Sequence, residues 1–348
     1  MERAVLLSGE HPGLPRAELE ALVAVHDPSA AMTPLVGRVV RVVPGDAAAT
    51  DAALSRMALA HAYGELWIED EDSEAGIARI ATRVAARTTG QGTAAVEAVR
   101  AGTDKSPNAP LAERTVGRAL VEAGHKIDLR RPGTTAFVWL LDGRAVAGRL
   151  LGRIDRTRFA GRALERRAHF SPVGLHPRRA ASLVHLARVP QGGRIHDPCC
   201  GTGTIVLEAA LDGYDAVGSD VDPVMVQGTL QALADDAPEP LDAVVFVADA
   251  AEAVPLVAAD AVVADLPYGV ASGTQREPVP CLYGRILTAV AASLRPGARA
   301  VLGCADLTLL PALGPLGLAL ESVHEERVHR SLTRRFAVIK RIEGVGPS

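Results

Sequence analysis

The segment that most constrains the fold is a strand, a loop and a helix between residues 194 and 208. It reads Arg194-Ile-His-Asp-Pro-Cys-Cys-Gly-Thr-Gly-Thr-Ile-Val-Leu-Glu208. A short apolar strand ends at Asp197, and a loop of small residues follows, where Gly201 and Gly203 allow backbone conformations that other residues rarely adopt. An apolar helix is expected over residues 204–210. This order is typical of an open sheet that binds a ligand where a strand meets a helix.

The chemistry of the loop narrows the class of ligand. Its exposed N–H groups favour polar or anionic groups, and small residues let a ligand approach the backbone closely. A Walker phosphate loop needs Gly-Lys-Ser/Thr at the start of the helix, whereas Gly203 is followed here by Thr204 and Ile205. We therefore expect a nucleotide-like ligand that lacks a triphosphate.

Three further apolar runs end in acidic residues. Residues 214–218 lead to Asp220, at the place where a doubly wound sheet presents a carboxylate to ribose hydroxyls. The next run leads to Asp249, which could accept the amino group of adenine, and the fourth ends at Asp265. A single acid of this kind is commonly a helix cap. Four acids at the ends of four successive strands, beginning with Asp197, are harder to explain by helix capping alone.

Length and composition indicate a globular protein with two domains, because 348 residues exceed one typical domain and 48% of them are hydrophobic. The cysteines show no paired CxxC spacing, so we expect no metal site and a reducing, cytoplasmic location. There is no signal-peptide core and no apolar run long enough to span a membrane. The four cysteines are Cys199, Cys200, Cys281 and Cys304.

The net charge of -4 argues against non-specific nucleic-acid binding by the whole chain, but the charge is unevenly distributed. Between residues 153 and 179, arginines greatly outnumber acids, a local basic surplus that is consistent with phosphate contacts. The alternative is a solvated, arginine-rich helix face. The arginines are Arg153, Arg156, Arg158, Arg162, Arg166, Arg167, Arg178 and Arg179.

The N-terminal half is expected to mix strands and helices. A strand at 3–8, a helix at 14–23, a strand at 36–43 and a helix at 52–63 have the rhythm of a small ferredoxin-like unit. Farther along, we expect a helical patch at 94–100 and a helix at 111–123 that ends before Gly124. Strands at 134–141 and 144–151 should form a hairpin through Asp142-Gly143.

The ordered acids and three stretches of sequence carry a resemblance to known families. The ordered acids resemble class I S-adenosylmethionine-dependent methyltransferases, and Asp265-Leu-Pro-Tyr-Gly269 resembles the Asn/Asp-Pro-Pro-Tyr signature of enzymes that methylate exocyclic amines of bases. Lys126-Ile-Asp-Leu-Arg-Arg-Pro-Gly133 resembles the THUMP domain of RNA-modifying enzymes. Val328-His-Arg-Ser-Leu-Thr-Arg-Arg-Phe336 is similar to the end of THUMP-containing tRNA guanine-N2 methyltransferases. Leu266 departs from the usual Pro, and Cys199 from the usual first glycine.

The resemblance implies an α/β protein whose C-terminal, Rossmann-like class I methyltransferase domain is preceded by an α+β ferredoxin-like and THUMP region. It implies a ferredoxin-like domain at 1–70, an RNA-binding THUMP domain at 71–155, a basic linker at 156–178 and the methyltransferase domain at 179–348. The expected substrate contact of the THUMP domain is the 3′ end of the RNA.

The resemblance also implies S-adenosylmethionine as the cofactor and assigns the site residues. Phe170 and Leu175 would cover the methionine end of the cofactor, although simple packing explains these two side chains equally well. The expected cofactor ligands are Phe170, Asp197, Cys199, Gly201, Gly203, Asp220, Val221, Asp249, Ala250 and Asp265. The expected catalytic residues are Asp265, Leu266, Pro267 and Tyr268. The expected RNA contacts are Lys126, Arg130, Arg131, Arg162, Arg166 and Arg167.

The activity implied is methylation of the N2 amine of a guanosine in tRNA, at position 10 or 6, by a monomer that needs neither a metal nor a membrane. Two alternatives stay open. An rRNA guanine-N2 or an adenine-N6 methyltransferase would also use an acid at Asp265, and a catalytically silent RNA-binding relative could retain the fold. Cofactor binding would separate the silent relative from the enzymes.

Overall fold

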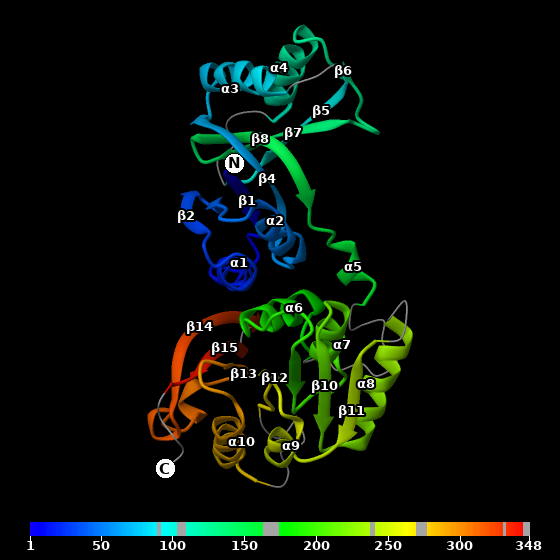
Figure 1. The fold of residues 1–348 in the computed structure, drawn as a ribbon, viewed down its shortest axis with the longest axis vertical. Helices are drawn as coiled ribbons and strands as arrows, with labels where there is room; N and C mark the ends of the chain where they lie inside the picture. The colour runs from blue at the N-terminus through cyan, green and yellow to red at the C-terminus, as the bar shows by residue number, and fades with distance from the viewer. Residues whose placement is uncertain are drawn as a thin grey trace. The chain divides into compact units, whose positions relative to one another are not determined.

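The computed structural model describes residues 1–88, 92–102, 109–162, 174–236, 241–268, 277–329 and 332–343. The chain forms two compact units (Figure 1). The first unit comprises Met1–Pro12 and His26–Ile154, and the second comprises Gly13–Val25 and Asp155–Ser348. The chain therefore passes from one unit to the other three times.

The first unit is built on one sheet with the strand order β2-β3-β1-β4-β8-β7-β5-β6. Most neighbouring strands are antiparallel, while β5 runs parallel to both β6 and β7. Its elements are β1 (Arg3–Leu7), β2 (Ala31–Val36), β3 (Val39–Val43), α2 (Ala47–Arg56), β4 (Ala60–Glu71), α3 (Glu74–Arg87), β5 (Thr93–Arg100), α4 (Ala109–Glu122), β6 (Lys126–Ile127), β7 (Thr134–Leu141) and β8 (Arg144–Arg153).

The strand β7 shows why both faces of this sheet are covered. Successive side chains of a strand point to opposite faces. Val138 belongs to a core with Ile80 and Val116 from α3 and α4, whereas Phe137 and Trp139 belong to a second core on the other face. The continuous apolar sequence of β7 is therefore the pattern of a strand buried on both sides.

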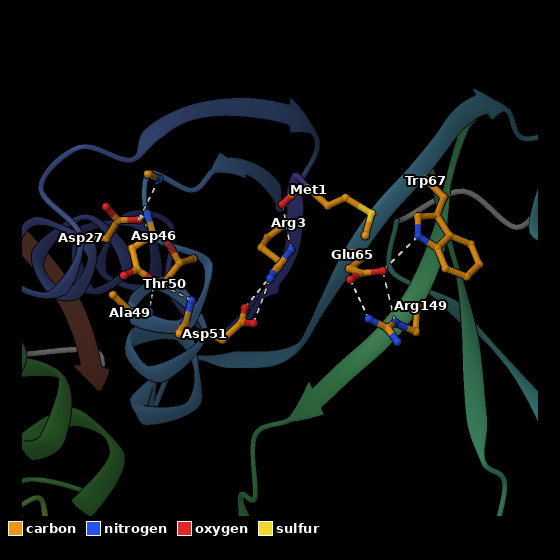
Figure 2. A network of polar contacts seen from close by, with 12 residues as sticks. Met1, Arg3, Asp27, Asp46, Ala49, Thr50, Asp51, Glu65, Trp67 and Arg149 are labelled. Atoms are coloured by element: carbon orange, nitrogen blue, oxygen red, sulfur yellow. Dashed lines mark hydrogen bonds and ion pairs between the residues drawn. The ribbon is translucent and has the colours of Figure 1, made fainter. Parts of the chain in front are cut away.

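Polar contacts join neighbouring elements of this unit (Figure 2). Glu65 on β4 is buried, and its carboxylate accepts hydrogen bonds from the Arg149 guanidinium on β8 at 2.7 Å and from the Trp67 indole at 3.2 Å. Arg3 on β1 donates in the same way to the Asp51 carboxylate of α2, at 2.7 and 2.9 Å. A buried carboxylate needs such partners to stay ionised.

Three sequence predictions in this unit are wrong. The helical patch at 94–100 is strand β5, because pairing with β7 along its length outweighs the helix propensity of its alanines. The helix at 52–63 ends at Arg56, and the chain turns into β4 to pair with β1. The single strand at 36–43 is the hairpin of β2 and β3, which turns at Gly37, where φ is +52°.

The helix at 111–123, which is α4, and the β7–β8 hairpin are confirmed within a few residues. The predicted boundary between residues 70 and 71 falls at the end of β4, inside the shared sheet. The division of this half into ferredoxin-like and THUMP domains stays a prediction.

The second unit has a sheet with the order β11-β10-β9-β12-β13-β15-β14. Its elements are α1 (Leu14–His26), α5 (Thr157–Ala160), α6 (Pro177–Leu186), β9 (Arg194–Asp197), α7 (Thr204–Leu211), β10 (Asp215–Asp220), α8 (Pro223–Asp236), β11 (Ala243–Val247), α9 (Ala250–Val257), β12 (Ala261–Asp265), α10 (Val279–Ser293), β13 (Arg299–Cys304), the 3₁₀ turns η3 (Leu307–Leu309) and η4 (Gly314–Leu316), β14 (Leu318–His329) and β15 (Leu332–Arg341).

The topology of this sheet locates its binding edge. Strands β11, β10, β9, β12 and β13 are parallel, whereas β15 is antiparallel to β13 and to β14. The order reverses at β9, since the chain moves outward to β10 and β11 and then crosses back to β12. Ligands bind open α/β sheets beyond the carboxyl ends of the strands at such a switch point. The four predicted acids lie at or just after the carboxyl ends of β9, β10, β11 and β12.

Helix α1 joins the second unit through a buried polar triad. The imidazole of His185 on α6 lies with Nδ1 2.7 Å from Glu18 Oε1 of α1 and Nε2 2.8 Å from Asp212 Oδ2, just after α7. His185 and Glu18 are almost completely buried. A segment from the N-terminal region is thus part of this unit's interior.

Candidate active site

The loop between β9 and α7 has the backbone geometry that its glycines predict. Gly203 has a φ of +79° and precedes α7, and a Cβ at this position would lie 2.5 Å from Cγ2 of Thr229. Gly201 has a φ of +52°, but a Cβ there would meet no atom within 4 Å. The side of the loop at Gly201 is therefore open, while the side at Gly203 is packed against α8.

Two carboxylates accept hydrogen bonds from backbone N–H groups of this loop. Asp197 is 2% exposed and accepts a hydrogen bond from the Cys199 N–H at 3.1 Å. Asp220 accepts hydrogen bonds from the N–H groups of Gly201 and Asp222, both at 2.9 Å, and so ties the loop to the end of β10. Each carboxylate oxygen has two lone pairs, which leaves Asp220 capacity for ribose hydroxyls.

The acids at the strand ends are close enough to perturb one another. Burial raises the pKa of Asp197 well above its usual value, and the charges of Asp220 and Asp265 raise it further. Burial also raises the pKa of Asp220. Like charges gathered in a poorly solvated place favour a ligand that brings positive charge or hydrogen-bond donors. S-adenosylmethionine, with its sulfonium, ammonium and hydroxyl groups, fits this set of acidic hydrogen-bond acceptors.

The two cysteines of the loop do not fit a nucleophilic role. Burial raises the pKa of the Cys199 thiol well above its usual value and also raises that of Cys200, and the nearby Asp197 adds to both shifts. Thiols in this state stay protonated and unreactive at neutral pH. Cys200 instead lies with Sγ 3.6 Å from the Thr229 hydroxyl, where it helps to pack the loop against α8.

The site predicted for adenine has a second role in the structure. Asp249 caps the N-terminus of α9, accepting a hydrogen bond from the Ala251 N–H at 3.0 Å, and it pairs with the Arg285 guanidinium at 2.9 and 3.0 Å. Arg285 lowers the pKa of Asp249. Ala250 is buried as the first residue of α9, and Val221 is exposed after β10. Contacts of these residues with adenine and ribose stay predictions.

The loop after β12 gathers the predicted catalytic residues. Asp265 ends the strand, and its carboxylate accepts a hydrogen bond from the Tyr268 hydroxyl. Leu266 is buried, and its N–H donates to the Gly303 carbonyl at 2.9 Å. The Pro267 carbonyl accepts a hydrogen bond from the Tyr283 hydroxyl at 3.0 Å. Two hydrogen bonds made by its backbone thus fix the loop directly after the acid.

The predicted RNA contacts fall into three groups. Lys126, Arg130 and Arg131 are exposed in the first unit, where the N–H groups of the two arginines bond to Asp128 at 2.9 and 3.0 Å. The Arg162 guanidinium pairs with the buried Glu208 carboxylate at 2.8 and 2.9 Å, so a phosphate contact there requires this pair to open. Phe170, Arg166 and Arg167 lie outside the described residues, as does Gly269.

The described residues contain neither a candidate metal cluster nor a membrane-spanning helix. No group of three or more His, Cys, Asp or Glu residues in that part of the chain could hold a metal ion. None of its helices combines the length and the apolar composition that crossing a membrane requires.

Comparison with known proteins identifies the family. A family model described as an RMKL-like methyltransferase domain matches residues 165–335. The tRNA (guanine(10)-N2)-dimethyltransferase of Methanothermobacter thermautotrophicus is 30% identical over 345 residues, which cover 98% of this chain and 100% of the relative. The chain belongs to the S-adenosylmethionine-dependent tRNA guanine-N2 methyltransferase family.

Two more relatives agree with this result. The tRNA (guanine(6)-N2)-methyltransferase of Thermus thermophilus is 31% identical over 329 residues, 87% of this chain and 88% of the relative. The solved structure of TrmN from Thermus thermophilus has a TM-score of 0.57 and 26% identity, and the match covers 98% of this chain and 100% of that one. The predictions of a methyltransferase family and of a Rossmann-like methyltransferase fold are confirmed.

Two arginines in this methyltransferase were not predicted as site residues. Arg285 on α10 pairs with Asp249, and Arg334 on β15 contacts both Asp265 and Tyr268. Arg334 lies in the C-terminal stretch that resembles the C-terminal part of proteins in this family. The sequence therefore marked this stretch as notable, but it did not indicate that Arg334 contacts Asp265 and Tyr268. Arg285 follows no recognisable motif, and only the packing of α10 against α9 brings it to the acid.

Proposed function

We propose that this methyltransferase transfers a methyl group from S-adenosylmethionine to the N2 amine of a guanosine in tRNA, at position 10 or 6. The observation that carries the proposal is the placement of Asp265. Its carboxylate lies at the end of β12, bonded to Tyr268 and close enough to Asp197 for their charges to interact. An amine acceptor thus lies beside the acids expected to bind the methyl donor.

The substrate amine needs this acceptor because its lone pair is delocalised into the guanine ring. A carboxylate that accepts a hydrogen bond from the N–H group orients the amine and directs the lone pair toward the methyl group. The Leu266 carbonyl would accept the second N–H, since the Pro267 carbonyl already accepts a hydrogen bond from Tyr283. Tyr268 would stack on the base after it leaves the RNA helix.

The cofactor fits the edge of the sheet described above. When bound, S-adenosylmethionine supplies an electrophilic methyl group on a sulfonium. Asp220 would accept hydrogen bonds from the ribose, Asp249 from the adenine amino group, and the open side of the loop at Gly201 would leave room for the cofactor beside the backbone. The Asp265 side chain is 18% exposed, so water would have limited access to the reacting groups.

The first unit would hold the RNA. Lys126, Arg130 and Arg131 are exposed there in one short segment. The resemblance of residues 71–155 to a THUMP domain implies that this part would bind the 3′ end of tRNA. Replacing all three by Glu should weaken tRNA binding and flatten its salt dependence by about one unit of slope for each phosphate that is no longer neutralised. An unchanged slope would remove this segment from the interface.

The relatives leave two nucleotides to distinguish, because one full-length relative is named for guanine 10 and another for guanine 6. Incubation with unmodified tRNA and labelled S-adenosylmethionine, followed by nucleoside mass spectrometry and fragment mapping, decides the product and its position. N2-methylguanosine or its dimethyl form at 10 or 6 is expected. N6-methyladenosine, or a methyl group in the anticodon loop, would overturn the proposal.

The role of Asp265 has its own test. Asp265→Ala should abolish methyl transfer while cofactor binding measured by calorimetry persists, since Asp265 is proposed to contact the amine. The matched control is Asp306→Ala, which removes an exposed acid just after the neighbouring strand β13 that caps η3. Activity of Asp265→Ala equal to that of the control would exclude the mechanism.

The catalytically silent alternative is tested by the same calorimetry on the unsubstituted protein. A silent RNA-binding relative need not bind S-adenosylmethionine, and it would give no methylated nucleoside from any tRNA. Retention of Asp197, Asp220 and Asp249 at the strand ends favours the active enzyme.

A further inference from the structure

Arg334 closes a triangle of contacts with the two side chains at the reacting end of the site. Its Nε donates to the Tyr268 hydroxyl at 2.8 Å, and its Nη2 lies 3.3 Å from Asp265 Oδ2. The Tyr268 hydroxyl in turn donates to Asp265 Oδ1. The guanidinium carbon also lies 5.6 Å from the centre of the Tyr268 ring. One guanidinium therefore contacts both the proposed amine acceptor and the proposed stacking residue.

This arginine has little contact with solvent, since its side chain is 3% exposed. Glu326 lies opposite Arg334 in the β14–β15 ladder and would compete for the guanidinium. Arg179, in the first turn of α6, pairs with Glu326 at 2.6 Å and so balances that charge. Arg334 reaches from β15 to the loop after β12, where it contacts Tyr268 and Asp265.

We propose that Arg334 is a positioning residue for methyl transfer, which keeps Asp265 in its carboxylate form and holds Tyr268 beside it. This inference rests on the proposed function, because it assumes that Asp265 accepts a hydrogen bond from the substrate amine. A protonated carboxyl group carries an O–H donor and loses acceptor capacity. The amine would then lose the acceptor that orients its lone pair.

The electrostatic surroundings explain why Asp265 needs this partner. Burial raises the pKa of Asp265, and Glu326 raises it further, whereas the Arg334 guanidinium and the Tyr268 hydroxyl oppose the rise. Asp197 is an additional nearby acid, since its own pKa responds to Asp265. The titratable and charged groups that interact with Asp265 come from several elements and are Asp197, Tyr268, Tyr283, Cys304, Glu326 and Arg334.

The test is the pH dependence of single-turnover methyl transfer to tRNA. Arg334→Met keeps an apolar stem of similar length and removes the charge. The acid limb is the low-pH part of the profile, where the rate falls as Asp265 is protonated. In Arg334→Met it should move to higher pH by about one unit or more, because an opposite charge at contact distance lowers a carboxyl pKa by about 1–3 units. Cofactor affinity should stay unchanged. Arg334→Lys, which retains the charge, should keep the acid limb close to its original position.

A matched control lies next to it on the same strand. Arg335 pairs with Glu325 at 2.7 Å, and Arg335→Met should leave the acid limb where it is in the unsubstituted protein. If Arg334→Met does not fold, Glu326→Gln tests the same electrostatic coupling. Loss of the Glu326 carboxylate should lower the pKa of Asp265 and so move the acid limb to lower pH. A folded Arg334→Met with an unmoved limb, or an unmoved limb in Glu326→Gln, overturns the inference.

Failure of the inference can be told from failure of the proposed function. If the unsubstituted protein gives no N2-methylguanosine at any pH, the proposed function is wrong. If it methylates guanosine and the acid limb is the same in Arg334→Met as in the unsubstituted protein, only the proposed role of this arginine is wrong.

Discussion

The stability of the second unit should fall at alkaline pH, because one buried imidazole holds a proton that the unfolded chain would release. Both ring nitrogens of His185 face carboxylate oxygens, of Glu18 at 2.7 Å and of Asp212 at 2.8 Å. Both nitrogens can donate a hydrogen bond only when the ring is protonated. Burial lowers the pKa of His185, but the two carboxylates outweigh it and raise the pKa to about 9.

The size and direction of the effect follow from that pKa. A rise from 6.5 to about 9 corresponds to about 3 kcal/mol of stabilisation, at about 1.4 kcal/mol for each pKa unit. The folded-state pKa is the higher one, so this contribution to the free energy of unfolding is fully present below pH 6.5. It decreases above that pH and is lost as the pH rises through about 9.

The assay is urea unfolding at a series of pH values between 6 and 10, followed by far-UV circular dichroism. Trp67 and Trp139, the chain's two tryptophans, both lie in the first unit, so their fluorescence reports that unit separately. The His185→Gln variant should be less stable at pH 6 and should show a flatter pH dependence. Parallel loss of stability in His185→Gln and in the unsubstituted protein would refute this account of the triad.

Three further outcomes are expected. Asp220→Ala should weaken binding of S-adenosylmethionine by about 1.5–3 kcal/mol, because a hydrogen bond to a charged group contributes about that much. Unchanged affinity in calorimetry would exclude Asp220 from the cofactor site. Arg162→Met should lower the free energy of unfolding by about 3–5 kcal/mol, because it removes the guanidinium that pairs with the buried Glu208 carboxylate. A small change would mean that this pair contributes little to stability. Gly203→Ala should cost about 1–3 kcal/mol, measured by urea unfolding, since φ is +79° and the new methyl group would lie 2.5 Å from Thr229.

The sequence alone predicted the part of the fold that depends on short-range patterns. The loop from Asp197 to Gly203 and the acids at the strand ends follow from local chemistry, because strands of a parallel sheet place their carboxyl ends at one edge. The strand at 94–100 was missed because its alanines favour a helix in isolation, and only pairing with β7 decides its conformation.

The contacts that complete the candidate site depend on long-range packing. Arg334 is 66 residues from Tyr268 along the chain, and Arg285 is 36 residues from Asp249. A sequence with many arginines offers many partners for each acid, and no local pattern selects one of them. The sequence likewise did not indicate that Glu18 belongs to the second unit, since its partner His185 lies 167 residues away.

The three passages of the chain between its units have a consequence for how such a gene can change. Because residues 13–25 supply a helix of the second unit, no single cut in the gene separates the coding regions of the two units. A recombination event that moved only the region after Ile154 would leave His185 without Glu18. The catalytic and N-terminal parts are therefore expected to be inherited together, so a shuffled descendant would have to replace the missing helix or lose the buried triad.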